Sequence, residues 1–425
     1  MTIDDTADRK APRARRLTVL LATLALGTAL LPHSASAESA TNDADLFSEN
    51  DRFLEFGTPD RNITLAPFIQ LDGGYTDFDP GSDYWDTSDN LVRLYVYGSY
   101  DDFGGTFAYD FQNKTFPVRY AFINYSPTDR LTFQVGQQDE PFSLQDYSGS
   151  RFLPFISAGQ SAALIPGDNV GGVIKYGGDN YSLAGGLFGG DVNTGVDDEG
   201  LAFTGRATWA PIYQESKITR SGDATRDGVG TQRVERLLHL GAAISTRFNL
   251  EQSFSFSGGT NSTLTSRSIA TSPSFFDADH ILRGNLETAV VLGSLSFQGE
   301  LTGVQVETAL KSGTAHGGYL YSTYFLTGET RGYDPSSGTF GRVIPRNPID
   351  EGGFGAFEVG ARIDYLDLTD LGPDGGAQFG VSTVANLYLT KRFTLTTDYS
   401  YTQATAGPND GQEVHAVTGR FQFAY

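Results

Sequence analysis

The 425-residue chain contains no cysteine, which excludes disulfide bonds, a thiolate nucleophile and cysteine-ligated metal sites. Histidine is also scarce, with five residues scattered along the chain. No pair of histidines has the spacing of a metal site, and no serine near them has the setting of a nucleophile elbow. We therefore expect no catalytic residues, no metal and no cofactor, and we do not expect an enzyme.

Positive charge is the next shortage. Lysine and arginine together number 30 against 51 aspartates and glutamates, which gives a formal net charge of −21. An acidic surface argues against a nucleic-acid partner. The acidic run Asp197-Asp198-Glu199 could hold divalent cations that bridge lipopolysaccharide, but a solvated loop is the simpler interpretation.

Long hydrophobic runs are absent after residue 37, so the sequence predicts no transmembrane helix in that part. The one long apolar run, Leu17–Leu31, follows a basic segment and precedes Ala35-Ser36-Ala37. This order predicts a secretory signal peptide over residues 1–37, removed after Ala37. A membrane anchor is the alternative, although the run is short for a span of about 20 residues.

Glycine, tyrosine and phenylalanine are abundant, with 51, 21 and 30 residues. Short runs of alternating apolar and polar residues, separated by glycine-rich turns, indicate an all-β protein. Composition alone leaves a soluble sandwich, a propeller or a barrel open. About sixteen such runs can be counted, near residues 62–76, 89–100, 104–113, 117–126, 130–137, 169–177, 180–188, 200–211, 236–248, 281–292, 295–307, 317–328, 354–366, 378–390, 391–402 and 413–425. The acidic, aperiodic residues 38–61 would form a periplasmic lead-in to a barrel over 62–425.

The faces of these runs favour a membrane barrel. In Arg392–Thr402, phenylalanine, leucine and tyrosine share one face, whereas the other face carries Arg392 and Asp398. Such a polar face suits a water-filled lumen better than a dry core. An even number of strands closes without an exposed edge. Most even-numbered connections are also short and most odd-numbered ones long, as in transmembrane barrels, with 212–235 and 329–353 as long exceptions and 114–116 as a short one.

The chain ends on an alternating run with Phe421, Phe423 and Tyr425. A last strand that closes on an aromatic residue is typical of the signal read by the outer-membrane barrel-assembly machinery. An ordinary closing strand is the alternative interpretation.

One stretch, Gln137–Asn169, breaks the alternation and is long and aromatic. Long loops in compact β-proteins usually have a function, so we expect a constriction loop near 138–168. We expect Glu140 to bond a wall arginine, with a role in selectivity as the alternative. We expect Phe142, Phe152 and Phe155 to pack the loop against the wall, with an aromatic path for solutes as the alternative. The charged residues of the loop are Asp139, Glu140, Asp146, Arg151 and Asp168.

Strand parity also selects charged residues for the lumen. A narrow pore replaces part of an ion's hydration with ligands of opposite charge, but neighbouring opposite charges could equally form salt bridges. The candidate pore-lining residues are Arg93, Asp110, Lys175, Arg206, Arg247, Arg283, Glu287, Glu358, Arg362, Asp398 and Arg420.

The sequence resembles the phosphate-selective porin O and P family. The matching residues include Glu140-Pro141-Phe142-Ser143, Ser150-Arg151-Phe152, Thr208-Trp209-Ala210-Pro211, Phe325-Leu326-Thr327-Gly328-Glu329, Gly341-Arg342-Val343 and Gly353-Phe354-Gly355-Ala356-Phe357-Glu358. The resemblance implies a sixteen-stranded homotrimeric porin whose third outer loop folds into the lumen, and it implies selectivity for phosphate or other anions. The four loop carboxylates against Arg151 instead favour cations, neutral solutes or mixed small metabolites.

The sequence thus predicts an outer-membrane porin of a Gram-negative bacterium that passes small hydrophilic solutes or ions by diffusion. Its expected partners are outer-membrane lipid and lipopolysaccharide, the assembly machinery, the solutes and two further copies of itself. A structural or adhesive outer-membrane barrel without transport is the alternative.

Overall fold

The computed structural model describes most of the chain after residue 53. The described residues are 54–58, 60–87, 91–112, 115, 117–194, 200–218, 231–251, 253–276, 278–309 and 312–425. The predicted signal peptide over 1–37, most of the predicted lead-in and the acidic run 197–199 lie outside them.

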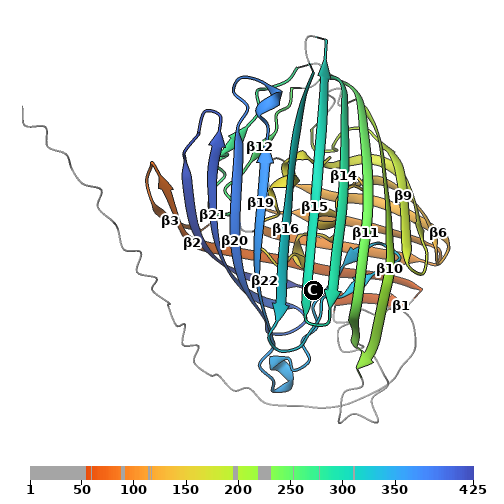
Figure 1. Cartoon of the computed structure of the whole chain (residues 1–425). Helices are drawn as coiled ribbons and strands as arrows, with labels where there is room; N and C mark the ends of the chain where they lie inside the picture. Colours follow the sequence, from red (N-terminus) through yellow and green to blue (C-terminus); the bar gives the residue numbers. More distant parts are fainter. Residues whose placement is uncertain are drawn as a thin grey trace, which may run out of the picture. The chain divides into compact units, whose positions relative to one another are not determined.

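Sixteen antiparallel strands form one closed barrel in the described part of the chain (Figure 1). The strands are β2 (Arg61–Asp79), β4 (Leu91–Tyr100), β5 (Phe103–Asp110), β6 (Val118–Thr128), β7 (Leu131–Asp139), β8 (Asp168–Gly177), β9 (Tyr181–Phe188), β10 (Leu201–Ile218), β11 (Thr231–Leu250), β14 (Ala278–Leu292), β15 (Leu295–Thr308), β16 (Ser312–Phe325), β19 (Ala356–Asp367), β20 (Ala377–Tyr388), β21 (Phe393–Ala406) and β22 (Glu413–Ala424). Each strand pairs with the next, and β22 pairs with β2 to close the ring, for example at Gln70 and Gln422. The predicted count and approximate positions of the strands are confirmed.

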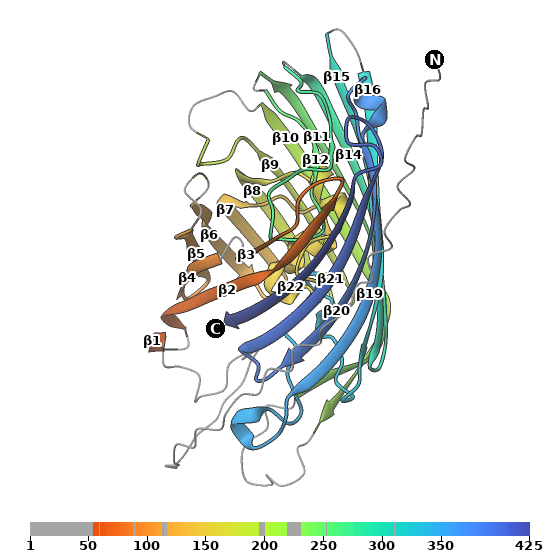
Figure 2. The ribbon, with the colours of Figure 1, turned by 90° about the vertical axis from the view of Figure 1, so that its left-hand side faces the viewer.

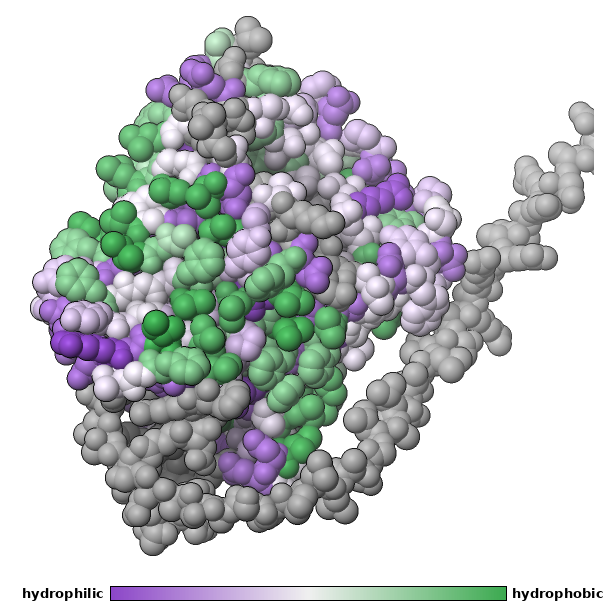
Figure 3. All heavy atoms as spheres, turned by 180° about the vertical axis from the view of Figure 1, so that it is seen from behind, coloured by the Kyte–Doolittle hydropathy of each residue, from purple (hydrophilic) through white to green (hydrophobic). Residues whose placement is uncertain are grey.

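The barrel is inverted relative to a soluble protein, because its polar side chains are the buried ones. On β14, Arg283, Asn285 and Glu287 are buried. On the opposite face of that strand, Leu286 is 62% exposed and Leu292 is 51% exposed. Large apolar side chains are exposed on most of the other strands too, and Figure 3 shows hydrophobic residues gathered across the middle of the face seen from behind. This pattern fits a wall with lipid outside and polar groups inside.

Three predicted boundaries differ from the structure. The lead-in expected to be aperiodic ends in a short strand, β1 (Glu55–Thr58), which pairs with the start of β2. The long connection expected over 212–235 shrinks because β10 and β11 extend into it. Their ladder shifts register between Trp209 and Ile212. Pro211 lies in this irregularity and has no N–H to donate, which ended the alternating pattern early in the sequence.

Short elements occupy the connections. They are β3 (Tyr84–Thr87), β12 (Ser257–Gly258), β13 (Ala270–Thr271), β17 (Tyr333–Asp334), β18 (Thr339–Phe340), the helix α1 (Leu144–Ser148) and the 3₁₀ helices η2 (Ser150–Phe152), η3 (Gln160–Leu164), η4 (Ile349–Glu351) and η5 (Thr369–Leu371). Among the described residues, no helix is long and apolar enough to cross a membrane.

Three connections pack against the buried faces of the strands. These are segment 140–167, between β7 and β8, segment 253–276, between β11 and β14, and segment 326–355, between β16 and β19. Leu164 of the first and Phe256 of the second share one cluster with β14, β15 and β19. Leu144 of the first and Phe340 of the third share another with β10, β11 and β14. These two clusters therefore consist of connections packed against strands.

Candidate functional site

Segment 140–167 contains little secondary structure of its own, so most of its backbone carbonyls lack partners within the segment. Buried carbonyls need donors, and side chains of the strands provide them. Arg283 donates to the carbonyl of Leu164 at 3.0 Å, and Arg362 donates to that of Ser157 at 2.7 Å. Further donors are Arg420 to Ile156 at 3.1 Å, Asn386 to Pro154 at 2.9 Å, Asn285 to Phe142 at 3.2 Å and Gln422 to Arg151 at 3.2 Å. Six strand side chains therefore hold the segment along its length.

Carboxylates complete this attachment. Glu300 of β15 accepts the backbone N–H groups of Leu144 and Gln145 at 3.0 and 2.8 Å. Glu140 forms an ion pair with Arg247 of β11 at 2.9 Å, which is the wall-arginine bond expected for it. It also accepts from Asn169 at 2.7 Å and from the hydroxyl of Thr204. Glu140 and Glu300 thus bond the segment to the strands β11 and β15.

The phenylalanines of segment 140–167 differ in how deeply they are buried. Phe142 and Phe155 are buried, and Phe155 packs with Tyr319, Tyr321 and Val384, as expected for residues that fasten a loop. Phe152 is only half-buried and lies beneath the guanidinium of Arg151, with 5.0 Å between its ring centroid and Cζ.

Segment 326–355 connects strands at the end of the barrel opposite to segment 140–167, and strand side chains bond it as well. Arg206 of β10 pairs with Glu287 of β14 at 2.7 Å and donates to the carbonyl of Gly338 at 2.8 Å. His239 lies between Glu287 and the hydroxyl of Tyr333, at 3.1 and 2.7 Å. Segments 140–167 and 326–355 also touch, because the N–H of Phe340 donates to Ser148 Oγ at 3.0 Å.

Most of the wall charges chosen by parity are therefore engaged with partners. Arg362 pairs with Asp364 at 2.8 Å, Arg420 with Asp72 at 2.6 Å, and Arg93 with Asp110 at 3.2 Å. Glu358 accepts from Asn386 and Tyr388 at 3.0 and 2.7 Å, and Lys175 donates to Gln134 at 3.0 Å. Asp398 is buried among these groups, with Oδ2 lacking a partner in the described structure.

An open cavity of about 550 Å³ remains between segment 140–167 and strands β4 and β6. Of the predicted residues it is lined by Arg93, Asp146, Arg151 and Asp168. Arg119, which parity did not select, lines it as well and bonds both Asp139, at 2.7 Å, and Asp168. The pairing of β5 with β6 shifts register between Ala108 and Tyr109 and leaves Arg119 unmatched in the ladder. A bulge re-aims a side chain in this way, and strict alternation could not reveal it.

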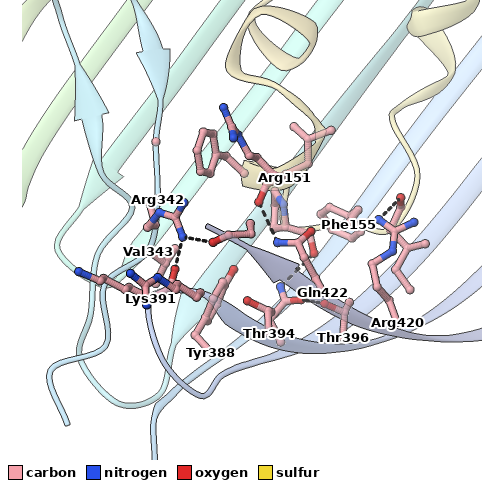
Figure 4. Close-up of a pocket in the computed structure, with 18 residues that line it drawn as sticks. Arg151, Phe155, Arg342, Val343, Tyr388, Lys391, Thr394, Thr396, Arg420 and Gln422 are labelled. Atoms are coloured by element: carbon pink, nitrogen blue, oxygen red, sulfur yellow. Dashed lines mark hydrogen bonds between the residues drawn. The ribbon is translucent and has the colours of Figure 1, made fainter. Parts of the chain in front are cut away.

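A second, smaller pocket of about 30 Å³ lies where segment 140–167 meets the end of the chain (Figure 4). Figure 4 shows Arg151, Arg342 and Arg420 around it, with Gln422 between them. Arg342 donates to the carbonyls of Ala424 and Tyr425 at 2.7 and 3.1 Å, and also to that of Lys391. Burial, together with the charges of Arg151 and Arg392, lowers the pKa of Arg342 to about 10.

The three C-terminal aromatic residues have different surroundings. Phe421 is 36% exposed on the outer face of β22, and Phe423 is half-buried against Phe393. Tyr425 is buried, with Cζ of Arg392 4.4 Å from its ring centroid.

A sixteen-stranded antiparallel barrel with an apolar outer face and a charged inner face is the architecture of an outer-membrane porin. Comparison with known sequences makes the family specific. The sequence pattern of the family described as "Phosphate-selective porin O and P" matches residues 71–425, and the chain belongs to that family.

Two relatives and two solved structures give the range of similarity. An uncharacterized protein of Caulobacter vibrioides is 27% identical over 348 residues, which cover 76% of this chain and 65% of that protein. Porin O of Pseudomonas aeruginosa is 22% identical over 373 residues, covering 81% of this chain and 82% of that protein. OmpT, an outer membrane protein of Vibrio cholerae, superposes with a TM-score of 0.51 at 10% identity and covers 87% of this chain and 99% of its own. An anion-selective porin from Comamonas acidovorans superposes with a TM-score of 0.50 at 13% identity, and the match covers 86% of this chain and 100% of that porin. At these identities the structures show a shared fold.

Proposed function

We propose that small hydrophilic solutes and ions diffuse through the barrel past segment 140–167, which narrows the lumen. The cavity of about 550 Å³ beside the segment supports this most directly, because charged side chains line an open space there. Elsewhere the segment is bonded to the wall by Arg283, Arg362, Arg420 and Glu300. A constriction held at so many points would keep a fixed width, as a passive pore requires.

The charge around this passage supports weak selectivity. Three guanidiniums, of Arg93, Arg119 and Arg151, line the cavity together with three carboxylates, of Asp146, Asp168 and Asp191. Opposite charges in equal number give the cavity no net charge, so neither cations nor anions are strongly favoured overall. The phosphate selectivity in the family's name would need more cationic than anionic side chains around this cavity. We therefore propose a general pore rather than a phosphate channel.

A planar-bilayer recording tests this proposal. The purified protein should open channels, and the reversal potential in a potassium chloride gradient should lie near zero, because both ions pass. A strongly anion-selective reversal potential with saturable block by phosphate would replace the general pore with a phosphate channel. Absence of channels would favour a structural or adhesive barrel.

We propose that the working form is a homotrimer. Strands β5 and β9 contain only 8 residues each, whereas β10 contains 18 (Figure 2). At ~3.4 Å per residue and a tilt near 40°, eight residues rise about 20 Å, which is less than the ~25 Å apolar band of such barrels. Neighbouring copies would cover this low part of the wall. Cross-linking in detergent at residues of β5 should yield trimers, whereas cross-linking at β15 should not.

We further propose that the chain is exported by a cleaved signal peptide over 1–37 to the outer membrane of a Gram-negative bacterium. The aromatic end of β22 would be recognised by the barrel-assembly machinery, and lipid and lipopolysaccharide would surround the exposed apolar band. No catalytic role is assigned to the chain. The N-terminal sequence of the protein isolated from outer membranes tests the cleavage site.

A further inference from the structure

Two charges of opposite sign in the 550 Å³ cavity lack an ionic partner in the described part of the chain. Of the six charged residues that line the cavity, Arg93 pairs with Asp110, and Arg119 pairs with Asp168. Asp191 accepts from Gln137 Nε2 at 3.1 Å and from the side chain of Asn193 at 2.7 Å. The carboxylate of Asp146 and the guanidinium of Arg151 remain, and both are partly exposed to the cavity.

The two charges belong to different sides of the cavity. Asp146 lies in α1 and is influenced by Asp139 and Arg119, on the β6–β7 side. Arg151 lies in η2, on the β4 side, where it donates to the hydroxyl of Tyr97 at 3.2 Å. Its Cζ atom lies 4.8 Å from the centroid of the Tyr95 ring. The cavity therefore has an acidic pole and a basic pole.

Gly149 keeps these poles apart. It separates α1 from η2 and has φ +84° and ψ 144°, a conformation that L side chains rarely adopt. Its N–H closes the end of α1 on the carbonyl of Asp146 at 2.9 Å. The chain then turns, so that Arg151 does not continue the helix that carries Asp146.

Aromatic rings form the wall between the poles. Tyr95 of β4 and Tyr120 of β6 line the cavity, with 6.2 Å between their ring centroids. An aromatic surface accepts aliphatic groups without a loss of hydrogen bonds. The arrangement is thus a basic end, an apolar middle and an acidic end.

We propose that this cavity favours zwitterionic solutes, with a carboxylate at Arg151, an ammonium group at Asp146 and an aliphatic spacer along Tyr95 and Tyr120. The proposal rests on the diffusion pathway described above. A simple ion is attracted by one pole and repelled by the other, whereas a zwitterion satisfies both. Each pole is partly exposed to the cavity, so each should contribute a roughly two- to fivefold preference, as exposed ion pairs do.

The acidic pole depends on pH. Burial, followed by the charge of Asp139, raises the pKa of Asp146 to about 7. The other charged groups that act on it are Arg119 of β6, which opposes the rise, and Glu300 of β15, which adds to it. The preference should therefore be complete above neutral pH and should weaken below it, where the carboxylate is protonated.

Liposome swelling with a series of ω-amino acids tests the proposal. Vesicles that contain the purified protein are placed, at about pH 8, in isosmotic glycine, β-alanine, 4-aminobutyrate or 6-aminohexanoate, and in neutral amide-alcohols of matched size. We expect at least one zwitterion to enter several times faster than its neutral counterpart. The chain length that gives the largest ratio measures the separation of the poles.

Variants assign the effect to the two residues. Asp146→Asn and Arg151→Gln should each lower the zwitterion preference by roughly two- to fivefold, and the double variant should bring the zwitterion rate down to the rate of the neutral solute. Asp179→Asn and Arg130→Gln are matched controls, because that ion pair is exposed, with side chains 85% and 53% accessible, and lies outside the cavity. Both controls should retain the wild-type ratio.

The outcomes separate this inference from the general pore function. Channels in potassium chloride without a zwitterion preference in the wild type would overturn the inference and leave the porin intact. A preference that survives both cavity variants would overturn the assignment to these residues. Loss of all channels in the wild type would reject the pore itself.

Discussion

The ion pair between Glu140 and Arg247 should be the strongest single attachment of segment 140–167. Glu140 is 2% exposed and Arg247 is 6% exposed, so both charges are removed from water. Besides Arg247, at 2.9 Å, Glu140 accepts from Asn169 at 2.7 Å and from Thr204. The test is Glu140→Ala, which leaves all three donors without their acceptor.

The size of the effect follows from the partners that remain. Removing one member of a buried ion pair costs about 3–5 kcal/mol, because the other charge stays buried. Arg247 keeps its bond to the carbonyl of Gly189 at 2.9 Å, which places the expected loss of unfolding free energy at the lower end, about 3 kcal/mol. Glu140→Gln preserves the shape and one acceptor oxygen, and should cost about 2 kcal/mol.

Urea unfolding in lipid vesicles, followed by tryptophan fluorescence, measures these losses. The double variant Glu140→Ala with Arg247→Met should be more stable than the sum of its single changes predicts, by about 1–3 kcal/mol, since it removes both charges. Glu307→Ala is the control, because its side chain is 46% exposed, and it should change stability by less than about 0.5 kcal/mol. A loss below about 1 kcal/mol for Glu140→Ala, with no coupling to Arg247, would refute the assigned role of the pair.

Three other predictions concern separate parts of the site. Arg119→Met leaves the carboxylates of Asp139 and Asp168 without the guanidinium that lies between them. It should lower the free energy of unfolding in urea by about 1–2 kcal/mol and increase channel noise, and an unchanged midpoint of urea unfolding would contradict this. Since the pKa of Asp146 is raised to about 7, its charge appears as pH rises through that value; cation permeability, from reversal potentials, should therefore increase from pH 6 to pH 8 in the wild type and stay constant in Asp146→Asn. Arg342→Ala removes three bonds to backbone carbonyls near the chain end, and should lower unfolding free energy by about 2–3 kcal/mol in urea; equal stability would show that these bonds are replaced by water.

Alternation allowed the wall to be predicted closely, because a strand that separates lipid from water must place apolar and polar residues on opposite faces. Runs such as 281–292 and 295–307 nearly coincide with β14 and β15. Within the wall, the prediction failed where the alternation is broken locally. Pro211 interrupts β10, and the bulge opposite Tyr109 hides Arg119.

The sequence could not predict which charged residues would pair with each other across the barrel. Strand parity selected Arg206, Arg247 and Glu287 for the lumen. Glu140 was predicted as a loop residue that bonds a wall arginine, but its partner, Arg247, lies 107 positions away in the chain. Such pairs depend on the stagger of the closed barrel and on the path of the loops, neither of which is encoded in local periodicity. For the same reason, segment 326–355 gave no sequence signal that it packs against the strands.

The bonds of Arg342 have a consequence for the order of assembly. Its acceptors are the carbonyls of Lys391, Ala424 and Tyr425, which all follow it in the chain, the last by 83 residues. These three bonds of segment 326–355 can form only when the last residues of the chain lie beside β2. The attachment of this segment through Arg342 is therefore coupled to closure of the barrel at the seam between β22 and β2.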